Sequence, residues 1–145
     1  MTLTSSALEP NGSLPARYTC DGSAVSPPLR WQKVPANAAA LVLIVIDDNG
    51  IRWMVGDINP KSTSVAEGRT PDGGIVGSSV HGQVGYEGIC PPHGKTTTVE
   101  FALYALRKKI ALSSGYLPKI AEAEYGSNRL ALAPATILIA KYHRP

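Results

Sequence analysis

The chain has 145 residues, of which 43% are hydrophobic and 17% charged, enough to bury one hydrophobic core in a single domain spanning residues 1–145. The net charge is +3, and the one basic run, Arg107–Lys109, lacks the interleaved aromatic residues of a nucleic-acid surface, so we expect no nucleic-acid partner. No stretch reaches the ~18 apolar residues of a membrane span, and the first residues lack the basic start and apolar core of an export signal. We therefore expect a cytoplasmic protein, with an exported protein whose leader has been removed as the alternative.

The first half of the chain predicts strands joined by tight turns. Residues 2–8 are expected to form a short edge strand, and the continuous apolar run of residues 41–46 indicates a strand buried on both faces. Asn49-Gly50 predicts a two-residue hairpin turn of type I′, because that turn needs positive φ at both central positions. Residues 51–58 then form the returning strand, which ends before Pro60 because proline cannot donate to a ladder.

The second half mixes irregular, extended and helical patterns. Residues 68–95 are rich in glycine and proline without periodicity, and a segment this long is usually functional or tightly pinned. Residues 96–106 alternate apolar and polar side chains, which predicts a half-buried strand, and residues 135–142 predict a closing strand. Between them, residues 116–126 place alanine and glutamate at helical spacing, and residues 127–133 could add a helical turn.

Four stretches carry motifs that occur together in one protein family. They are YTCDGSAVSPPLRW (18–31), GQVGYEGICPPHG (82–94), FALYAL (101–106) and LALAPATILIAKY (130–142). Together they resemble the phosphatidylethanolamine-binding proteins, and most closely the small bacterial and archaeal branch described as Raf-kinase-inhibitor-like. The resemblance implies a mostly β fold, with a large central antiparallel sheet, a smaller sheet packed on it and short helices near the C-terminus.

The resemblance also implies a small pocket at one end of the sheet that binds phosphate-like groups, including phospholipid head groups. Backbone N–H groups and imidazoles would donate hydrogen bonds to phosphate oxygens there, and a glycine would let the backbone come close. The residues of this chain at the pocket positions, which are the expected ligand-binding residues, are Asp47, Arg52, Tyr86, Gly88, Cys90, Pro91 and Pro92.

Several pocket positions depart from the family pattern. The Asp-Pro-Asp-Ala-Pro loop of the family is reduced to Asp47 and the Asn49-Gly50 turn, and Arg52 stands where a histidine is expected. Thr97–Val99 replace a His-Arg-Tyr triplet, and Ile89 replaces a usual proline. The pocket is therefore predicted to be diverged, with fewer donors than the family pattern supplies.

Two interpretations of Arg52 stay open. Its guanidinium could bind phosphate or carboxylate as a fixed positive charge with a fork of donors. It could instead pair with Asp47 or Asp48 on the facing strand of the hairpin, which is the structural interpretation.

The pattern favours a non-enzymatic protein without a cofactor. Its expected ligand is a small anion, a phosphorylated group or a lipid head group. The alternative is a protein-interaction or inhibitor module of the same fold, of the kinase- or protease-inhibitor kind, with a vestigial pocket. A hydrolase is disfavoured, since Ser79 and His81 lack a nucleophile elbow and an evident orienting group. The oligomeric state is open, with a homodimer among the options.

The two cysteines, Cys20 and Cys90, could be buried thiols or a disulfide in an oxidising compartment. Together with His81 and His93 they lack the paired Cys-x₂-Cys spacing of a structural zinc site, so no metal is expected. Cysteines at both positions recur together in the family that the chain resembles, which implies that the two lie near one another.

Overall fold

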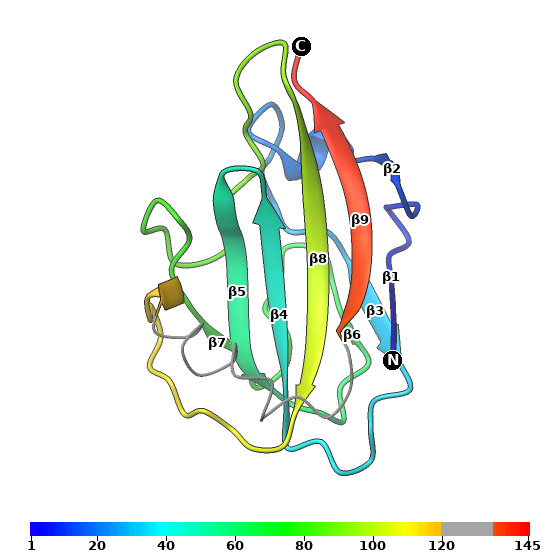
Figure 1. Ribbon diagram of the computed structural model, residues 1–145, viewed down its shortest axis with the longest axis vertical. Helices are drawn as coiled ribbons and strands as arrows, with labels where there is room; N and C mark the ends of the chain where they lie inside the picture. Colours follow the sequence, from blue (N-terminus) through cyan, green and yellow to red (C-terminus); the bar gives the residue numbers. More distant parts are fainter. Residues whose placement is uncertain (120–134) are drawn as a thin grey trace.

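Two packed β-sheets make up the fold, and the larger one carries the candidate site at one end (Figure 1). The structure is a computed structural model that describes residues 1–119 and 135–145. Its elements are β1 (Thr2–Thr4), β2 (Gly12–Ser13), the 3₁₀ turn η1 (Ala16–Tyr18), β3 (Leu29–Gln32), β4 (Ala40–Asp47), β5 (Gly50–Ile58), β6 (Ser64–Val65), β7 (Ile75–Val76), β8 (Thr96–Leu106) and β9 (Thr136–His143). The larger sheet has the strand order β2-β9-β8-β4-β5-β7, and the smaller has the order β1-β3-β6.

The strands of the larger sheet lie almost to the residue where the hydrophobic pattern predicts them. β4 contains the apolar run 41–46, and β5, β8 and β9 match the strands expected at 51–58, 96–106 and 135–142. β1 confirms the expected edge strand, because it borders the smaller sheet. The predicted mostly β fold, with a large and a small sheet, is therefore confirmed.

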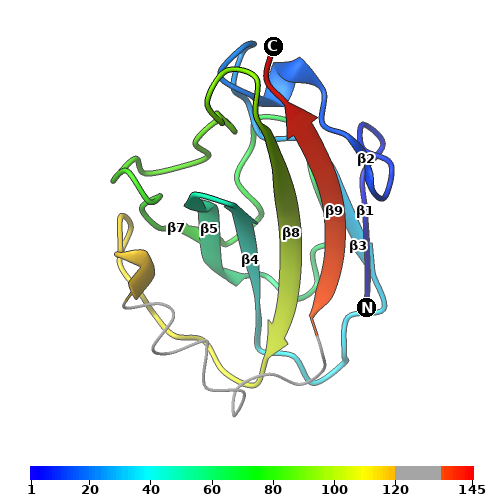
Figure 2. The ribbon, with the colours of Figure 1, turned by 45° about the horizontal axis from the view of Figure 1, so that its top comes forward.

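The inner core lies between the two sheets. Because side chains alternate along a strand, Leu43 and Val45 of β4 share one face with Leu103 and Phe101, their partners on β8. All four belong to one buried cluster with Trp31 of the smaller sheet. Figure 2 shows β1 and β3 behind the plane of β8 and β9, on the side that this core fills.

A second core covers the opposite face of the larger sheet. Val42 of β4 and Met54 of β5 point to this face and are fully buried with Tyr116 from the segment that follows β8. Asp57 fastens that segment to the sheet, because its carboxylate accepts the N–H of Ile110 at 2.9 Å and of Ala111 at 2.8 Å.

The helical turns expected within residues 116–133 fall mainly on residues 120–134, which lie outside the described residues. The short C-terminal helices stay a prediction. In the part of the chain that the structure does describe, no helix has the length and apolar character needed to cross a membrane.

The hairpin between β4 and β5 turns one residue earlier than predicted. Asp47 pairs with Gly50, so the two turn residues are Asp48 and Asn49, and neither has positive φ. The Asp47 carboxylate explains the shift, because its Oδ1 accepts the N–H of Asn49 at 2.8 Å and fixes the turn there. Gly50 takes the positive φ instead, at 126°. The hairpin is confirmed, and its assignment to type I′ was wrong.

Candidate functional site

Arg52 lies on a β-bulge at the start of β5. Val45 and Ile46 of β4 pair with Trp53 and Ile51, so Arg52 is the extra residue between two ladder pairs. Residues two apart on a regular strand face the same way, but the bulge lets Ile51 face the outer core while Trp53 faces the inner core. The bulge thus re-aims the start of β5 at the end of the sheet where the pocket is expected.

The Arg52 guanidinium is held between two carboxylates. Its Nε donates to Oδ2 of Asp47 at 2.9 Å, and its Nη1 donates to Oε2 of Glu87. The side chains of Arg52 and Asp47 are only 3% and 0% exposed, so this ion pair is buried. The structural interpretation of Arg52, a pair with Asp47 across the hairpin, is confirmed.

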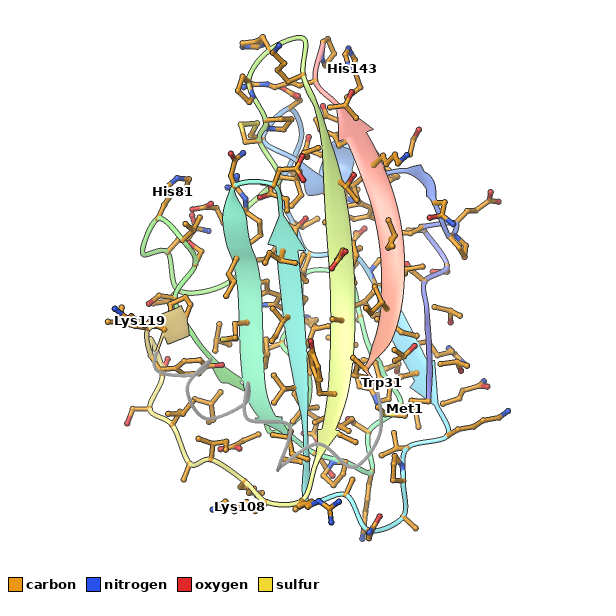
Figure 3. The ribbon with its side chains drawn as sticks, in the orientation of Figure 1. Met1, Trp31, His81, Lys108, Lys119 and His143 are labelled. Atoms are coloured by element: carbon orange, nitrogen blue, oxygen red, sulfur yellow. A yellow bond between two sulfur atoms is a disulfide. The ribbon has the colours of Figure 1, made fainter. Side chains whose placement is uncertain are left out.

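Glu87 is the centre of a wider polar network. Ser79 Oγ donates to Glu87 Oε1 at 3.1 Å, and Nδ1 of His81 lies 2.9 Å from Oε2. Burial alone would raise the pKa of the Glu87 carboxyl, but the contacts with His81 and Ser79 and the charge of Arg52 outweigh it and lower that pKa. Glu87 is therefore ionised at neutral pH. His81 itself lies on an exposed loop beside β5 (Figure 3).

The network contains two carboxylates, those of Asp47 and Glu87, and one guanidinium, that of Arg52. An ionised carboxylate offers only acceptors and a guanidinium only donors, so Asp47 and Glu87 each accept one hydrogen bond from Arg52. An anion approaching Arg52 would meet two carboxylates that already neutralise its charge. The ligand-binding role of Asp47 and Arg52 stays a prediction, and this geometry weighs against it.

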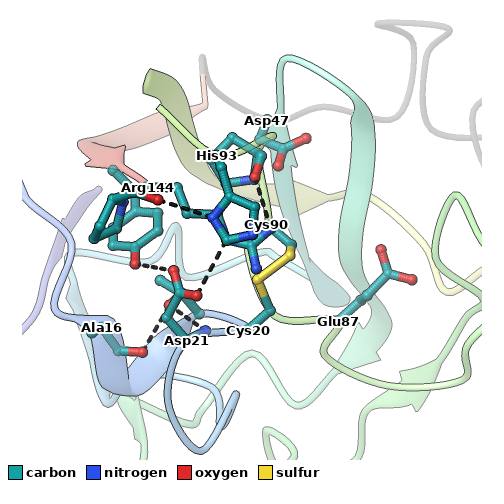
Figure 4. Close-up of a disulfide and its surroundings, with 12 residues drawn as sticks. Ala16, Cys20, Asp21, Asp47, Glu87, Cys90, His93 and Arg144 are labelled. Carbon is teal, nitrogen blue, oxygen red and sulfur yellow. Dashed lines mark hydrogen bonds and ion pairs between the residues drawn. A yellow bond between two sulfur atoms is a disulfide. The ribbon is translucent and has the colours of Figure 1, made fainter. Parts of the chain in front are cut away.

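The Cys-Pro-Pro part of the expected pocket is fastened by a disulfide. Cys20 and Cys90, 70 positions apart in sequence, are bonded, which answers the question that the sequence left open (Figure 4). The bond joins the segment 88–92 to the loop that follows η1. A main-chain hydrogen bond of 3.1 Å from Cys20 N–H to Ile89 O lies beside it.

Residues at the C-terminus contact the same segment, 88–92, and the loop after η1. Arg144 donates through Nη1 to the carbonyl of Pro91 at 3.3 Å and through Nε to Oδ1 of Asp21 at 3.2 Å. The hydroxyl of Tyr142 donates to the other oxygen of Asp21. Arg144, directly after β9, thus ties the predicted pocket residue Pro91 to Asp21, which Tyr142 of β9 also contacts (Figure 4).

Gly88 and Tyr86 also make contacts within the protein. A Cβ on Gly88 would lie 2.8 Å from the Cβ of Ala24, so the close backbone approach expected at this glycine is to the protein itself. The Tyr86 hydroxyl donates to the carbonyl of Tyr18 at 2.7 Å, and its ring meets Trp53 edge-on with ring centroids 5.7 Å apart. Burial is the main cause that raises the pKa of the Tyr86 phenol, which stays protonated.

The structure brings Asp47 and Arg52 together, and places Tyr86 next to Glu87, but the sequence reasoning missed Glu87 itself. The sequence does carry one signal for it, because an acidic residue stands directly after Tyr86, one of the expected pocket residues. Thr97, which replaces a family histidine, is buried and accepts the N–H of Asp48 at 3.2 Å.

Comparison with known sequences agrees with the architecture. The family model described as phosphatidylethanolamine-binding protein matches residues 4–140. A UPF0098 protein of Methanothermobacter thermautotrophicus is 40% identical over 125 residues, covering 79% of this chain and 82% of the relative. LppC of Mycobacterium tuberculosis, whose name is that of a lipoprotein, is 36% identical over 141 residues, covering 90% of this chain and 70% of the relative.

Solved structures show the same fold. CT736 of Chlamydia trachomatis, described as a homologue of phosphatidylethanolamine-binding protein, superposes with a TM-score of 0.87 at 28% identity and covers 99% of this chain and 97% of its own. YbcL of E. coli, described as a new member of the mammalian family, also gives a TM-score of 0.87, with 99% and 98% covered, and at 24% identity it speaks for the fold alone. Since the family model spans most of the sequence, this chain belongs to the phosphatidylethanolamine-binding protein family.

Proposed function

We propose that the protein is a non-catalytic interaction module of its family, which contacts a protein partner through an apolar surface and keeps the family pocket only as a vestige. The observation that carries this proposal is the Arg52 guanidinium, which is buried between Asp47 and Glu87. A pocket for phosphate or a phospholipid head group would need this charge to be free for the ligand.

The magnitudes support this choice. Breaking a buried ion pair by taking away one partner costs about 3–5 kcal/mol, and the contacts of an anion would have to offset this cost before any net affinity remained. A small anion that opened the pair between Arg52 and Asp47 would therefore lose affinity by that amount. Protein contact does not require the pair to open.

An apolar surface lies beside the closed pocket, and we name it the hairpin surface. It comprises four exposed side chains, Ile46, Val80, Val84 and Leu117, of which Leu117 is the most exposed at 57%. Three of them line a groove of about 680 Å³ between the β4–β5 hairpin and the segment around Leu117. Val84 lies against the same segment, because a Cβ on Gly115 would be 3.5 Å from its side chain. A contiguous apolar surface of this kind is typical of protein contacts.

Hydrolysis is the less supported reading of this region. A nucleophilic serine needs a histidine base that a carboxylate orients, so the imidazole must lie between the other two groups. Here the carboxylate of Glu87 lies between Ser79 and His81. Ser79 donates to a carboxylate that already binds Arg52, which leaves no imidazole to take its proton.

The disulfide supports an oxidising compartment as the protein's location, which was the alternative expected from sequence. Disulfides persist in exported proteins and are rare in the cytosol. The Cys20–Cys90 bond is therefore better accommodated by export than by the cytoplasmic location.

A photoreactive residue at position 80 tests the interaction. We expect it to cross-link a discrete partner from the source organism, and we expect the matched probe at Ile137, an equally exposed apolar residue on β9, to cross-link none. Leu117→Ser should abolish the product at position 80. Calorimetry with phosphate and phosphorylethanolamine should show no binding. Binding that Arg52→Gln abolishes, with no cross-link at position 80, would restore the anion-binding function instead.

A further inference from the structure

A second hollow lies on the inner side of β5, away from the hairpin surface. It has a volume of about 290 Å³, near the lower limit for small-molecule sites. Its walls come from three separate parts of the chain: Trp53 on β5, Tyr86 on the long irregular segment, and the loops that contain Ser26 and Arg69. The two loops are tied together, because the N–H of Gly68 donates to the carbonyl of Ser26 at 3.0 Å.

Two donors on residues that line this cavity form no hydrogen bond with the described residues. The Trp53 indole is 2% exposed, yet its N–H makes no hydrogen bond within residues 1–119 or 135–145. The other tryptophan shows what is missing, since the Trp31 N–H donates to the carbonyl of Ser62 at 2.7 Å. The hydroxyl of Ser26, which is 4% exposed, is likewise unbonded to any described residue.

The rim of the cavity adds a free positive charge. Arg69 and Thr70 line it, and the Arg69 guanidinium forms no ion pair with the residues that the structure describes. The nearest acidic neighbour in sequence, Glu67, is already occupied by Arg17 at 2.8 Å and by the hydroxyl of Tyr18 at 2.8 Å. No carboxylate lines the described part of this cavity. The described polar side chains of the lining are therefore, apart from one phenol, one guanidinium, one indole N–H and two hydroxyls, all of which can donate to an anion.

We propose that this cavity binds a small carboxylate with a flat apolar body. The Trp53 N–H and the Ser26 hydroxyl are available to donate to an acceptor on the ligand, and each such hydrogen bond contributes about 0.5–1.5 kcal/mol. Arg69 offers its fork of donors to the carboxylate from the rim. The edge-to-face rings of Trp53 and Tyr86 supply the apolar wall for the flat body. The lining of this site shares no residue with the Arg52 network or the hairpin surface, so the site goes beyond the proposed function.

Benzoate is a suitable probe, and the two indole N–H signals in a ¹H–¹⁵N NMR spectrum are the readout. We expect benzoate to shift the Trp53 signal saturably, while the Trp31 signal, whose N–H is already bonded, stays in place. Benzamide, which has the same ring without the charge, should bind more weakly by about tenfold or more, since a hydrogen bond to a charged group contributes about 1.5–3 kcal/mol.

Variants of exposed arginines separate the site from general charge. Arg69→Gln should weaken benzoate binding about tenfold, and Arg30→Gln, the same change at an exposed arginine on β3, should leave it unaltered. Both arginines are on the surface, so neither variant threatens the fold. An immobile Trp53 signal, or an Arg69→Gln protein that binds as the wild type does, would overturn the proposal. Inorganic phosphate binding as tightly as benzoate would overturn the apolar part of it.

Discussion

At the scale of single residues, the charge of a buried arginine must be balanced by a neighbouring anion. The carboxylates that balance Arg52 are therefore occupied by this structural role. One carboxylate here has two structural tasks: Oδ1 of Asp47 fixes the hairpin turn through Asn49, and Oδ2 accepts from Arg52. Glu87 likewise joins Arg52 to Ser79 and His81. The charged groups of the vestigial pocket therefore act on one another, and their removal should be felt as lost stability.

Arg52→Met should lower the free energy of unfolding by about 3–5 kcal/mol, because it leaves Asp47 and Glu87 buried without their cation. Urea denaturation measures the change. Arg17→Met is the matched control, since it removes the same side chain from an exposed pair with Glu67, which water and salt screen, and it should have a much smaller effect. Equal losses for the two variants would show that the burial of the Arg52 pair contributes nothing special.

Glu87→Gln should change how stability depends on pH. The folded protein lowers the pKa of the Glu87 carboxyl below its ordinary value of 4.5, so ionisation stabilises the fold above that pH. This contribution is lost as pH falls through the lowered pKa. The difference in unfolding free energy between wild type and Glu87→Gln should therefore be constant above pH 4.5 and shrink in stronger acid. A difference that grows on acidification would contradict the assignment.

The contact of Arg52 with Asp47 could be predicted from the sequence, but its contact with Glu87 could not, because the two pairs differ in how far apart their residues lie along the chain. Arg52 and Asp47 are 5 positions apart across a hairpin whose pairing the hydrophobic pattern already indicates. Glu87 reaches Arg52 from 35 positions away, within an irregular segment that has no periodicity to define where each side chain points. Local pairing rules apply to the first contact, while the second depends on the tertiary path of a loop.

At the scale of elements, the irregular segment that precedes β8, residues 68–95, is held less by β-sheet hydrogen bonds than by contacts with other parts of the chain. β7 has two residues, and the other described strand pairings of the segment are two isolated bridges, from Ser78 to Val84 and from Ile89 to Thr19. The Cys20–Cys90 disulfide and the contact from Arg144 to Pro91 fasten its far end. The sequence predicted a segment that is either functional or tightly pinned, and the contacts that fasten it come from residues near both ends of the chain.

Cutting the disulfide should loosen that segment and lower global stability. Because the bond closes a loop between residues 70 apart, we expect Cys20→Ser to lower the free energy of unfolding by about 2–4 kcal/mol. Urea denaturation with and without dithiothreitol checks this. The reductant should lower the stability of the wild type and leave the double variant Cys20→Ser/Cys90→Ser unaltered; an equal response from both proteins would count against a role for the bond.

At the scale of the whole molecule, two cores rest on the same strands. Val42 and Leu43 are neighbours on β4, but they belong to the outer and the inner core respectively. A strand buried on both faces is a continuous apolar run in sequence, which is how β4 could be identified, and the alternation of residues 96–106 identified β8. What covers the outer face could not be identified in this way, because the segment after β8 is held there by the Asp57 carboxylate and not by a periodic apolar pattern.

Because the two cores share strands, we expect the protein to unfold in one cooperative transition. A mutation in the outer core tests this prediction. Met54 is fully buried in the outer core, so Met54→Ala should cost about 2–5 kcal/mol. Both tryptophans, Trp31 and Trp53, lie in the inner core. Neither tryptophan belongs to the mutated outer core, but if the two cores unfold together, tryptophan fluorescence should still report the lost stability. The urea midpoint of Met54→Ala should then fall by the same amount when it is measured by fluorescence and by far-UV circular dichroism. Leu43→Ala, a truncation of a fully buried residue in the inner core, is the matched comparison.

A fluorescence midpoint that stays at the wild-type value in Met54→Ala would mean that the outer core unfolds separately, and the strands would then not couple the two layers.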